Sequence, residues 1–230
     1  MKSSKVKCSL DSCMMCRLCI KEWLPAVDGN RHNYTFKKGE RIFNEGEEVK
    51  GIYFIHDGTV KVHKKWGDKE LILRFARKGA IAGHRGMGGD LIYPVSATAL
   101  EPVTVCYVDL DFFKATIKIN HDLIYELLMF YAGELKESER NMRNLAHMSV
   151  KGRIAQALLT LHDKFGVKEN GAIDIELSRQ DFASFVGTTY ETVFRMLNEL
   201  IENRLIEVAG KSITIIDKEN LYKLTTEIES

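Results

Sequence analysis

Short apolar runs separated by glycines fill residues 31–109. The runs lie at residues 34–36, 41–43, 52–55, 60–63, 71–75, 95–100 and 103–108. Within them, Val60-Lys61-Val62-His63 alternates apolar and polar positions, which is the pattern of a strand with one buried face. Short strands at this spacing predict a small antiparallel barrel or roll.

The pattern takes a helical period after residue 109. We expect a short helix over 109–117 and a long one that starts at Asn120 or Asp122 and runs to about His147. Apolar positions four and three residues apart recur along the long helix and define a heptad seam. The seam predicts an interface with a second copy of the chain, and packing on the chain's own β-domain is the alternative. The interface residues are Ile124, Leu128, Tyr131, Leu135, Met142 and Leu145.

Two further helices are expected after a break at residues 147–149, one over 150–165 and a last short one from Asp217. Between them, residues 177–204 read as two helices joined by a tight turn. Ser178, followed three residues later by Asp181, resembles a capping box, and Gly187 can take the left-handed backbone that ends a helix.

The second of these two helices has one apolar face and one mixed face. Thr188 or Thr189 can cap its start. The expected buried residues are Val193, Met196, Leu197, Leu200 and Ile201, and the opposite face carries Tyr190, Glu191, Phe194, Arg195 and Asn198. This layout is typical of a helix-turn-helix whose second helix enters the major groove of DNA.

Arg195 and Glu191 are the candidates for reading bases. Arginine can donate two hydrogen bonds to guanine, and glutamate can accept one from the cytosine amino group. The alternative is that the two side chains, one helical turn apart, pair with each other on a solvated face. Candidate contacts to the DNA around them are Ser178, Gln180, Thr188, Thr189, Tyr190, Arg153 and Lys211, with the last two and the Ser178 backbone holding phosphates.

The stretch from Ser178 to Leu197, with Glu191-Thr192-Val193-Phe194-Arg195 at its core, resembles the helix-turn-helix of the CRP/FNR family of bacterial transcription regulators. The resemblance implies an α+β chain with an N-terminal antiparallel β-roll of the cyclic-nucleotide-binding kind, a long dimerisation helix and a C-terminal winged helix-turn-helix. It divides the chain into a cysteine-rich segment (1–20), a sensory β-roll (21–119), a dimerisation helix and hinge (120–148) and a DNA-binding domain (149–230). Residues 205–216 would form the wing, as two short strands around Gly210-Lys211.

The ligand pocket departs from the family's cyclic-nucleotide pattern. That pattern has a glutamate for the ribose and an arginine for the cyclic phosphate, whereas this chain has Ala82-Gly83-His84 and then Tyr93-Pro94. Because a buried phosphate needs a cationic partner, we expect no cyclic AMP. Arg85 is near these residues in the sequence but is displaced from the position of the family's phosphate-binding arginine. His84 is expected to be a hydrogen-bonded or solvated loop residue, and a haem or metal ligand is the alternative.

Four of the five cysteines, Cys8, Cys13, Cys16 and Cys19, lie in the first 20 residues. The C-x2-C-x2-C spacing from Cys13 to Cys19 is that of three ligands of a [4Fe–4S] cluster. Cys106 is the candidate for the fourth ligand, since its strand resembles the one that supplies the distant ligand in the FNR branch of the family, and Cys8 is the alternative. A thiolate zinc site, or free thiols that form a reversible disulfide, remain open.

Net charge is +1, so any DNA affinity must come from a local basic patch. No apolar run is long enough for a membrane span, and the N-terminal residues lack the apolar core of a signal peptide, so we expect a cytoplasmic protein that does not engage membranes.

The full expectation is a homodimeric regulator that binds two-fold symmetric double-stranded DNA, contacts RNA polymerase and responds to an effector. That effector is oxygen or redox state through the cluster, or an unknown small molecule in a metal-free β-roll. A ligand-binding module that contacts protein instead of DNA is one alternative, and a metal-dependent enzyme is another. His56, His63 and His84 are isolated and no nucleophile–base motif appears, so we expect no catalytic residues.

Overall fold

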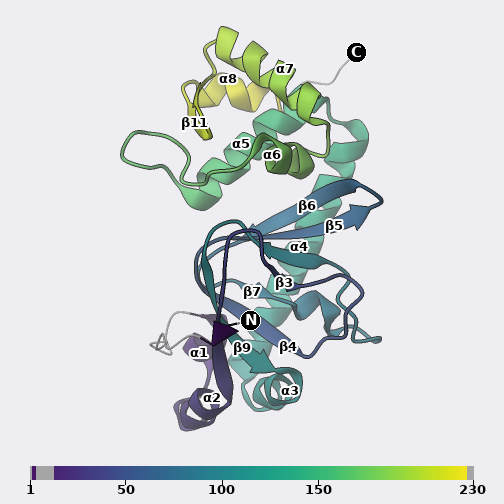
Figure 1. Ribbon diagram of the computed structural model, residues 1–230, viewed down its shortest axis with the longest axis vertical. Coiled ribbons are helices and arrows are strands. Elements are labelled where there is room, and N and C mark those ends of the chain that lie inside the picture. Colours follow the sequence, from purple (N-terminus) through teal and green to yellow (C-terminus); the bar gives the residue numbers. More distant parts are fainter. Residues whose placement is uncertain (1, 4–12, 227–230) are drawn as a thin grey trace. The chain divides into compact units, whose positions relative to one another are not determined.

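The computed structural model describes residues 2–3 and 13–226. The chain forms two compact units, Met1–Leu135 and Lys136–Ser230, and the division falls inside a long helix, α4 (His121–His147). Figure 1 shows the order of the elements along the chain. None of the described helices is both long enough and apolar enough to cross a membrane.

The first unit is an antiparallel β-roll, as predicted. One sheet has the order β1-β2-β9-β4-β7, and a second has the order β3-β8-β5-β6. The strands are β1 (Lys2–Ser3), β2 (Arg31–Phe36), β3 (Arg41–Phe43), β4 (Gly51–Asp57), β5 (Val60–Trp66), β6 (Lys69–Ala76), β7 (Ile81–Ala82), β8 (Ser96–Ala99) and β9 (Val103–Asp109). The short strand β7 has no counterpart among the predicted runs, because two residues carry no readable period.

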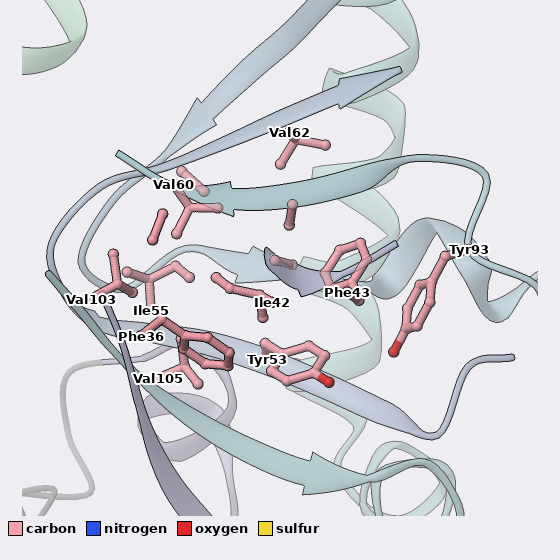
Figure 2. Close-up of a cluster of buried hydrophobic side chains, with 14 of the residues drawn as sticks. Phe36, Ile42, Phe43, Tyr53, Ile55, Val60, Val62, Tyr93, Val103 and Val105 are labelled. Carbon is pink, nitrogen blue, oxygen red and sulfur yellow. The ribbon is translucent and has the colours of Figure 1, made fainter. Parts of the chain in front are cut away.

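The interior of the roll is an apolar core between the two sheets. Val60 and Val62 of β5 face Ile55 of β4 and Val105 of β9 across it (Figure 2). The rings of Phe43, Tyr53 and Tyr93 gather toward one end, and Phe36 lies beside Ile55 and Val105. This core explains the apolar runs seen in the sequence, since β2, β4, β5, β8 and β9 contribute alternate side chains to it.

Strands β4 and β9 are buried on both faces. Tyr53 and Ile55 point into the roll, while Ile52 and Phe54 point to the other side. On β9, likewise, Val105 faces the roll and Cys106 faces away. A strand covered on both faces reads as a continuous apolar run, as Ile52-Tyr53-Phe54-Ile55 does.

Helices cover that outer face of β4 and β9. They are α1 (Met14–Leu18), the 3-10 turn η1 (Lys21–Trp23), α2 (Leu24–Asn30), α3 (Leu110–Ile119) and the first half of α4. A second 3-10 turn, η2 (His84–Met87), follows β7. Helix α1, whose five residues lie between the cysteines, was not predicted from the sequence.

The second unit holds α5 (Val150–Phe165), α6 (Arg179–Val186), α7 (Tyr190–Glu202), the hairpin β10 (Ile206–Ala209) and β11 (Ser212–Ile215), and α8 (Lys218–Lys223). The predicted helix over 150–165 and the two strands of the wing are confirmed. Buried residues of α5, α6 and α7, among them Leu158, Phe182 and Leu200, form its core.

Helix α4 carries two apolar stripes where the sequence predicted one. Leu123 and Leu127 are buried, and Phe130 and Tyr131 pack beside them against the β-roll. Tyr131, which the sequence assigned to the dimer seam, is half-buried beside the β-roll, where its hydroxyl donates to the carbonyl of His84 within the same chain. The other five seam residues, Ile124, Leu128, Leu135, Met142 and Leu145, are between 41% and 65% exposed.

Candidate nucleic-acid interface and cysteine cluster

Helix α6 begins and ends where its capping residues require. The Ser178 hydroxyl accepts a hydrogen bond from the Asp181 N–H at 3.0 Å, so the predicted cap is confirmed. Gly187 ends the helix with a φ of +74°, a left-handed conformation that costs glycine little. The turn into α7 is thus fixed by local chemistry alone.

Helix α7 starts at its cap Thr189, whose side chain accepts from the Thr192 N–H at 3.3 Å. Val193, Leu197 and Leu200 are buried, as predicted, whereas Ile201 is 38% exposed because it lies near the end of the helix and beyond the core. The face opposite the core is open along its length, and its exposed residues are Tyr190, Glu191, Phe194, Arg195 and Asn198. In the described part of the chain no ion pair joins Glu191 to Arg195, so the alternative in which they satisfy each other is not what the structure contains.

The wing is a two-stranded hairpin that turns at Gly210, where φ is +61°. Lys211 follows the turn and is exposed. The guanidinium of Arg179, at the start of α6, donates to the carbonyl of Gly210 at 2.8 Å and so ties the wing turn to the helix-turn-helix. Sequence reasoning missed this contact, because nothing in the spacing of the two residues indicates it.

Three further candidates occupy different positions. Gln180 is exposed on the first turn of α6, and Thr188 is half-buried with its N–H bonded to the Ala183 carbonyl at 3.1 Å. Arg153 donates to the carbonyl of Met148, just before α5, at 2.8 Å and to that of Val186, the last residue of α6, at 3.2 Å. The guanidinium therefore braces the turn between these helices, and its contact with a phosphate stays a prediction.

Aromatic rings close the wide end of the β-roll interior. Phe43 stacks on Tyr93 with centroids 4.2 Å apart and on Tyr53 at 5.6 Å (Figure 2). The Tyr93 hydroxyl donates to the Gly51 carbonyl at 2.8 Å, and burial, the largest effect, raises the pKa of Tyr93 to about 12. These rings stand in the region where the family's nucleotide pattern was sought.

His84 is not the solvated or hydrogen-bonded loop residue that the sequence predicted. It opens η2, is 1% exposed, and neither ring nitrogen has a hydrogen-bond partner. Its ring packs edge-on against Phe130 and Tyr131 of α4. Adjacent glycines suggested an open loop, but the helix that covers them is 46 residues further along the chain.

Four cysteines lie in one buried cluster on the outer face of β4 and β9. Cys13 caps α1, Cys16 lies within it and Cys19 ends it, while Cys106 comes from β9. None of these four cysteines forms a disulfide bond. Cys8 lies outside the described residues. Among the residues that are described, no group of three or more His, Cys, Asp or Glu side chains is gathered closely enough to hold a metal ion.

The thiols in this cluster differ in acidity. Contact with Cys16, whose N–H donates to the Cys13 sulfur at 3.5 Å, lowers the pKa of Cys13 to about 7. Burial raises the pKa of Cys19, although Asn120 opposes this. Asn120, at the junction of α3 and α4, also accepts from the Ile20 N–H at 2.7 Å. The end of the cysteine motif is therefore hydrogen-bonded to the start of the long helix.

Comparisons with known proteins agree with this geometry. The cyclic nucleotide-binding domain family matches residues 34–120, and the Crp-like helix-turn-helix domain family matches residues 152–224. A CRP-like cAMP-activated global transcriptional regulator of Mycobacterium tuberculosis is 30% identical over 191 residues, covering 82% of this chain and 85% of its own. The transcriptional activator FnrA of Stutzerimonas stutzeri is 26% identical over 221 residues, covering 94% and 90%.

Two solved structures share the fold. FixK2 from Bradyrhizobium japonicum superimposes with a TM-score of 0.77 at 23% identity, over 86% of this chain and 99% of its own. A CooA mutant from Carboxydothermus hydrogenoformans gives 0.76 at 18% identity, over 97% and 98%. With both domain families matched in order along most of its length, the chain belongs to the CRP/FNR family of bacterial transcription regulators.

Proposed function

We propose that this regulator binds a two-fold symmetric DNA site as a homodimer and reads each half-site with α7. The observation that carries the proposal is the exposed face of α7, on which Glu191 and Arg195 are one turn apart with no ion pair between them among the described residues. Arg195 would donate to a guanine, and Glu191 would accept from a cytosine amino group. Tyr190 and Phe194, 43% and 54% exposed, would contact thymine methyl groups beside them.

The exposed seam of α4 supports the dimer. Ile124, Leu128 and Leu135 leave a long apolar stripe in contact with water in the single chain, and Met142 and Leu145 continue it. Apolar patches of this kind mark interaction surfaces. Pairing two copies along the stripe would present two recognition helices about 34 Å apart, one turn of DNA. RNA polymerase would be the partner of the DNA-bound dimer.

The decisive experiment is titration of the protein against a duplex with two inverted half-sites found by selection from random sequence. Specific binding at about 10⁻⁸ M or tighter, weakened by disrupting either half-site, is expected. Equal affinity for the selected duplex and for one of scrambled sequence would contradict the proposal.

For the effector, we propose a [4Fe–4S] cluster held by Cys13, Cys16, Cys19 and Cys106. The four cysteines belong to one buried hydrophobic cluster, and the three at α1 and its two ends keep the sequence spacing of iron–sulfur ligands. The described side chains are not gathered at metal-binding distance, so loading a cluster would have to draw the cysteines together. The bound cluster would supply a redox-active group that links α1 to β9. Because the same segment bonds to Asn120 at the start of α4, a change at the cysteines would be felt at the dimer helix.

Cyclic AMP does not enter this proposal. Stacked rings of Phe43, Tyr53 and Tyr93 fill the wide end of the roll, and the residue after Gly83 is an apolar-packed histidine in place of a carboxylate. The glutamate for the ribose and the arginine for the cyclic phosphate that the family's nucleotide pattern requires are therefore not at those positions of this chain.

Anaerobic purification with iron, sulfide and zinc analysis tests the cysteine assignment. Roughly four irons per chain and bleaching in air are expected, and Cys16→Ser should remove both colour and iron. Trp23 lies between the cysteine motif and α3, stacked on Phe112 at 5.9 Å, so its fluorescence should be quenched in the loaded protein even without DNA. One zinc per chain would favour the zinc site instead, and a metal-free protein with a reversible Cys13–Cys16 disulfide would favour the thiol alternative.

A further inference from the structure

A small apolar hollow lies inside the second unit, between the helix-turn-helix and the wing. Its walls come from α5, the start of α6, the wing strand β11 and the segment 173–177 that leads into α6 (Figure 1). The enclosed part measures about 10 Å³, and together with the open space at its mouth the hollow measures about 290 Å³. An apolar cavity of this size holds hydrocarbon in preference to water. The buried residues that line it are Leu158, Leu161, Ile173, Leu177, Phe182 and Ile213.

The path of the backbone explains why the hollow exists. Ala172 forms a bridge with Thr214 of the wing, and the Ile173 N–H donates to the Ile213 carbonyl at 2.9 Å. The chain then leaves the wing and reaches the cap of α6 at Ser178. Ile175, which is half-buried, lines the hollow within this stretch. Because the segment diverges from β11 after Ile173, the side chains of α5 and α6 do not fill the space between them.

Two cationic side chains, Arg179 and Lys211, also line the hollow. Arg179 uses Nη2 for its bond to the Gly210 carbonyl, which carries the guanidinium from α6 toward the wing turn. Lys211 comes directly after that turn and is exposed. Within the described part of the chain, neither side chain forms an ion pair and no carboxylate belongs to the lining. The hollow therefore combines apolar walls with positive charge that has no counter-ion there.

The acidic residues that flank Arg179 in the sequence have other partners. Glu176 binds Lys168 at 3.0 Å, and the Asp181 carboxylate accepts from the Ser178 hydroxyl. A counter-ion for Arg179 and Lys211 must therefore come from outside the chain. A DNA phosphate would meet the two charges but would leave the apolar hollow empty, whereas an anion with a hydrocarbon tail would match both features.

We propose that this hollow binds a short aliphatic monocarboxylate, with the tail against the apolar walls and the carboxylate between Arg179 and Lys211. A guanidinium fork matches a carboxylate, and affinity should rise about fourfold for each methylene that leaves water. Because Lys211 is also the expected phosphate contact of the wing, the bound acid would compete with DNA. The site stands on the geometry of the second unit alone, whereas its effect on DNA binding rests on the proposed function.

An NMR titration of the full chain, with isotope-labelled isoleucine methyl groups and no DNA, tests the site. Acetate, butyrate and hexanoate are compared at constant ionic strength. The signals of Ile173, Ile175 and Ile213, which line the hollow, should shift saturably, while that of Ile55 in the core of the β-roll should not. Hexanoate should bind at least about tenfold more tightly than acetate because more of its chain is buried. The uncharged 1-hexanol should bind at least about tenfold more weakly than hexanoate.

Three variants assign the binding to the hollow. Ile175→Phe fills the space and keeps both cations, so it should weaken hexanoate binding at least about tenfold. If Ile175→Phe does not fold, Arg179→Gln removes the charge but keeps a donor for the Gly210 carbonyl, and it should give a similar loss. Lys218→Ala is the matched control, because Lys218 is a cation of the same unit that is 53% exposed and does not line the hollow. Its affinity for hexanoate should equal that of the parent protein.

Equal binding of hexanol and hexanoate, equal shifts at Ile55, or unchanged hexanoate affinity in Ile175→Phe or Arg179→Gln would overturn the proposal. Competition is measured separately: hexanoate at ten times its Kd should weaken binding to the selected duplex about tenfold, and unchanged DNA affinity would refute the competition. The NMR readout uses protein without DNA, so its failure leaves the DNA-reading proposal intact. Conversely, a protein that binds hexanoate here but shows no sequence-specific DNA binding would support the site and refute the proposed function.

Discussion

The helix-turn-helix and the β-roll hold their functional side chains in opposite ways. On α7, Glu191 and Arg195 are four residues apart, exposed, and oriented by a helix whose caps lie within the same short stretch. Between the β-roll and α4, Arg85 and Glu134 are 49 residues apart and form an ion pair that is largely withdrawn from water. The first kind of site can be lost without loss of the fold, whereas the second kind is part of the fold and changes stability when it is altered.

The largest expected effect comes from disrupting the exposed apolar seam of α4, which belongs to neither of the two sites just compared. Leu128→Asp combined with Leu135→Asp should give a folded monomer, because both side chains are at least 60% exposed and their loss leaves the core of each unit intact. Specific DNA affinity should fall by about 10³-fold toward the non-specific level.

Sedimentation velocity and DNA titration check this pair of changes. Trp66→Asp serves as the control, since Trp66 is 88% exposed but lies at the end of β5, away from the seam. A double variant that still sediments as a dimer would place the interface elsewhere.

Low pH should reduce the stability of the first unit more than that of the second. Burial, the largest influence, would raise the pKa of Glu134, but its interactions with His84, Arg74 and Arg85 prevail and lower it from 4.5 to about 2. Contact with His63 lowers the pKa of Glu70 to about 2 as well, while burial lowers the pKa of His84 below 6.5. All three folded-state values are depressed, so the unfolded chain binds more protons and stability falls as the pH falls.

The β-roll should therefore lose stability first below about pH 6.5, as unfolded His84 protonates, and then more steeply between 4.5 and 2. In the second unit, the acids with lowered pKa, Asp163 and Asp217, are on the surface, so its acid sensitivity should be smaller. Tryptophan fluorescence, which reports the first unit, should change at higher pH than the far-ultraviolet helix signal. Coincident transitions would contradict this ordering.

Arg195→Ala tests the exposed site on α7 and should reduce DNA affinity less than disruption of the dimer seam does. We expect a loss of about 1–3 kcal/mol in binding to the preferred half-site and relaxed selectivity at one base pair, with no change in thermal stability. Fluorescence anisotropy with single-base variants of the duplex measures both. If binding to scrambled DNA weakened equally, Arg195 would be a phosphate contact and not a base reader.

Lys211→Ala should give the smallest effect. The side chain is exposed on the wing beyond the Gly210 turn, so it should contribute one phosphate contact, uniform across sequences. The slope of log affinity against log salt should decrease by about 1. Arg179→Met is the informative comparison, because it should let the wing turn move and alter that slope without removing Lys211.

The sequence by itself determined the features that depend on interactions between residues close together along the chain. The caps at Ser178 and Thr189, the left-handed turn at Gly187, the wing hairpin and the buried Val193–Leu197–Leu200 face follow from interactions within about ten residues. The β-roll was predictable as a class for the same reason, since alternation and turn residues are local.

Only the tertiary structure decided which partner each surface meets. The heptad spacing placed Tyr131 in the predicted dimer seam, but in the structure its hydroxyl bonds to the backbone of His84. The second stripe of α4, which runs from Leu123 to Glu134 and faces the β-roll, was not predicted. The bonds that Arg153 makes to backbone carbonyls were likewise not predictable from the sequence. Burial and charge pairing depend on segments that are far apart in the sequence and meet only in the folded chain. A period of 3.6 residues predicts that a helix has an apolar face, but it does not predict what that face contacts.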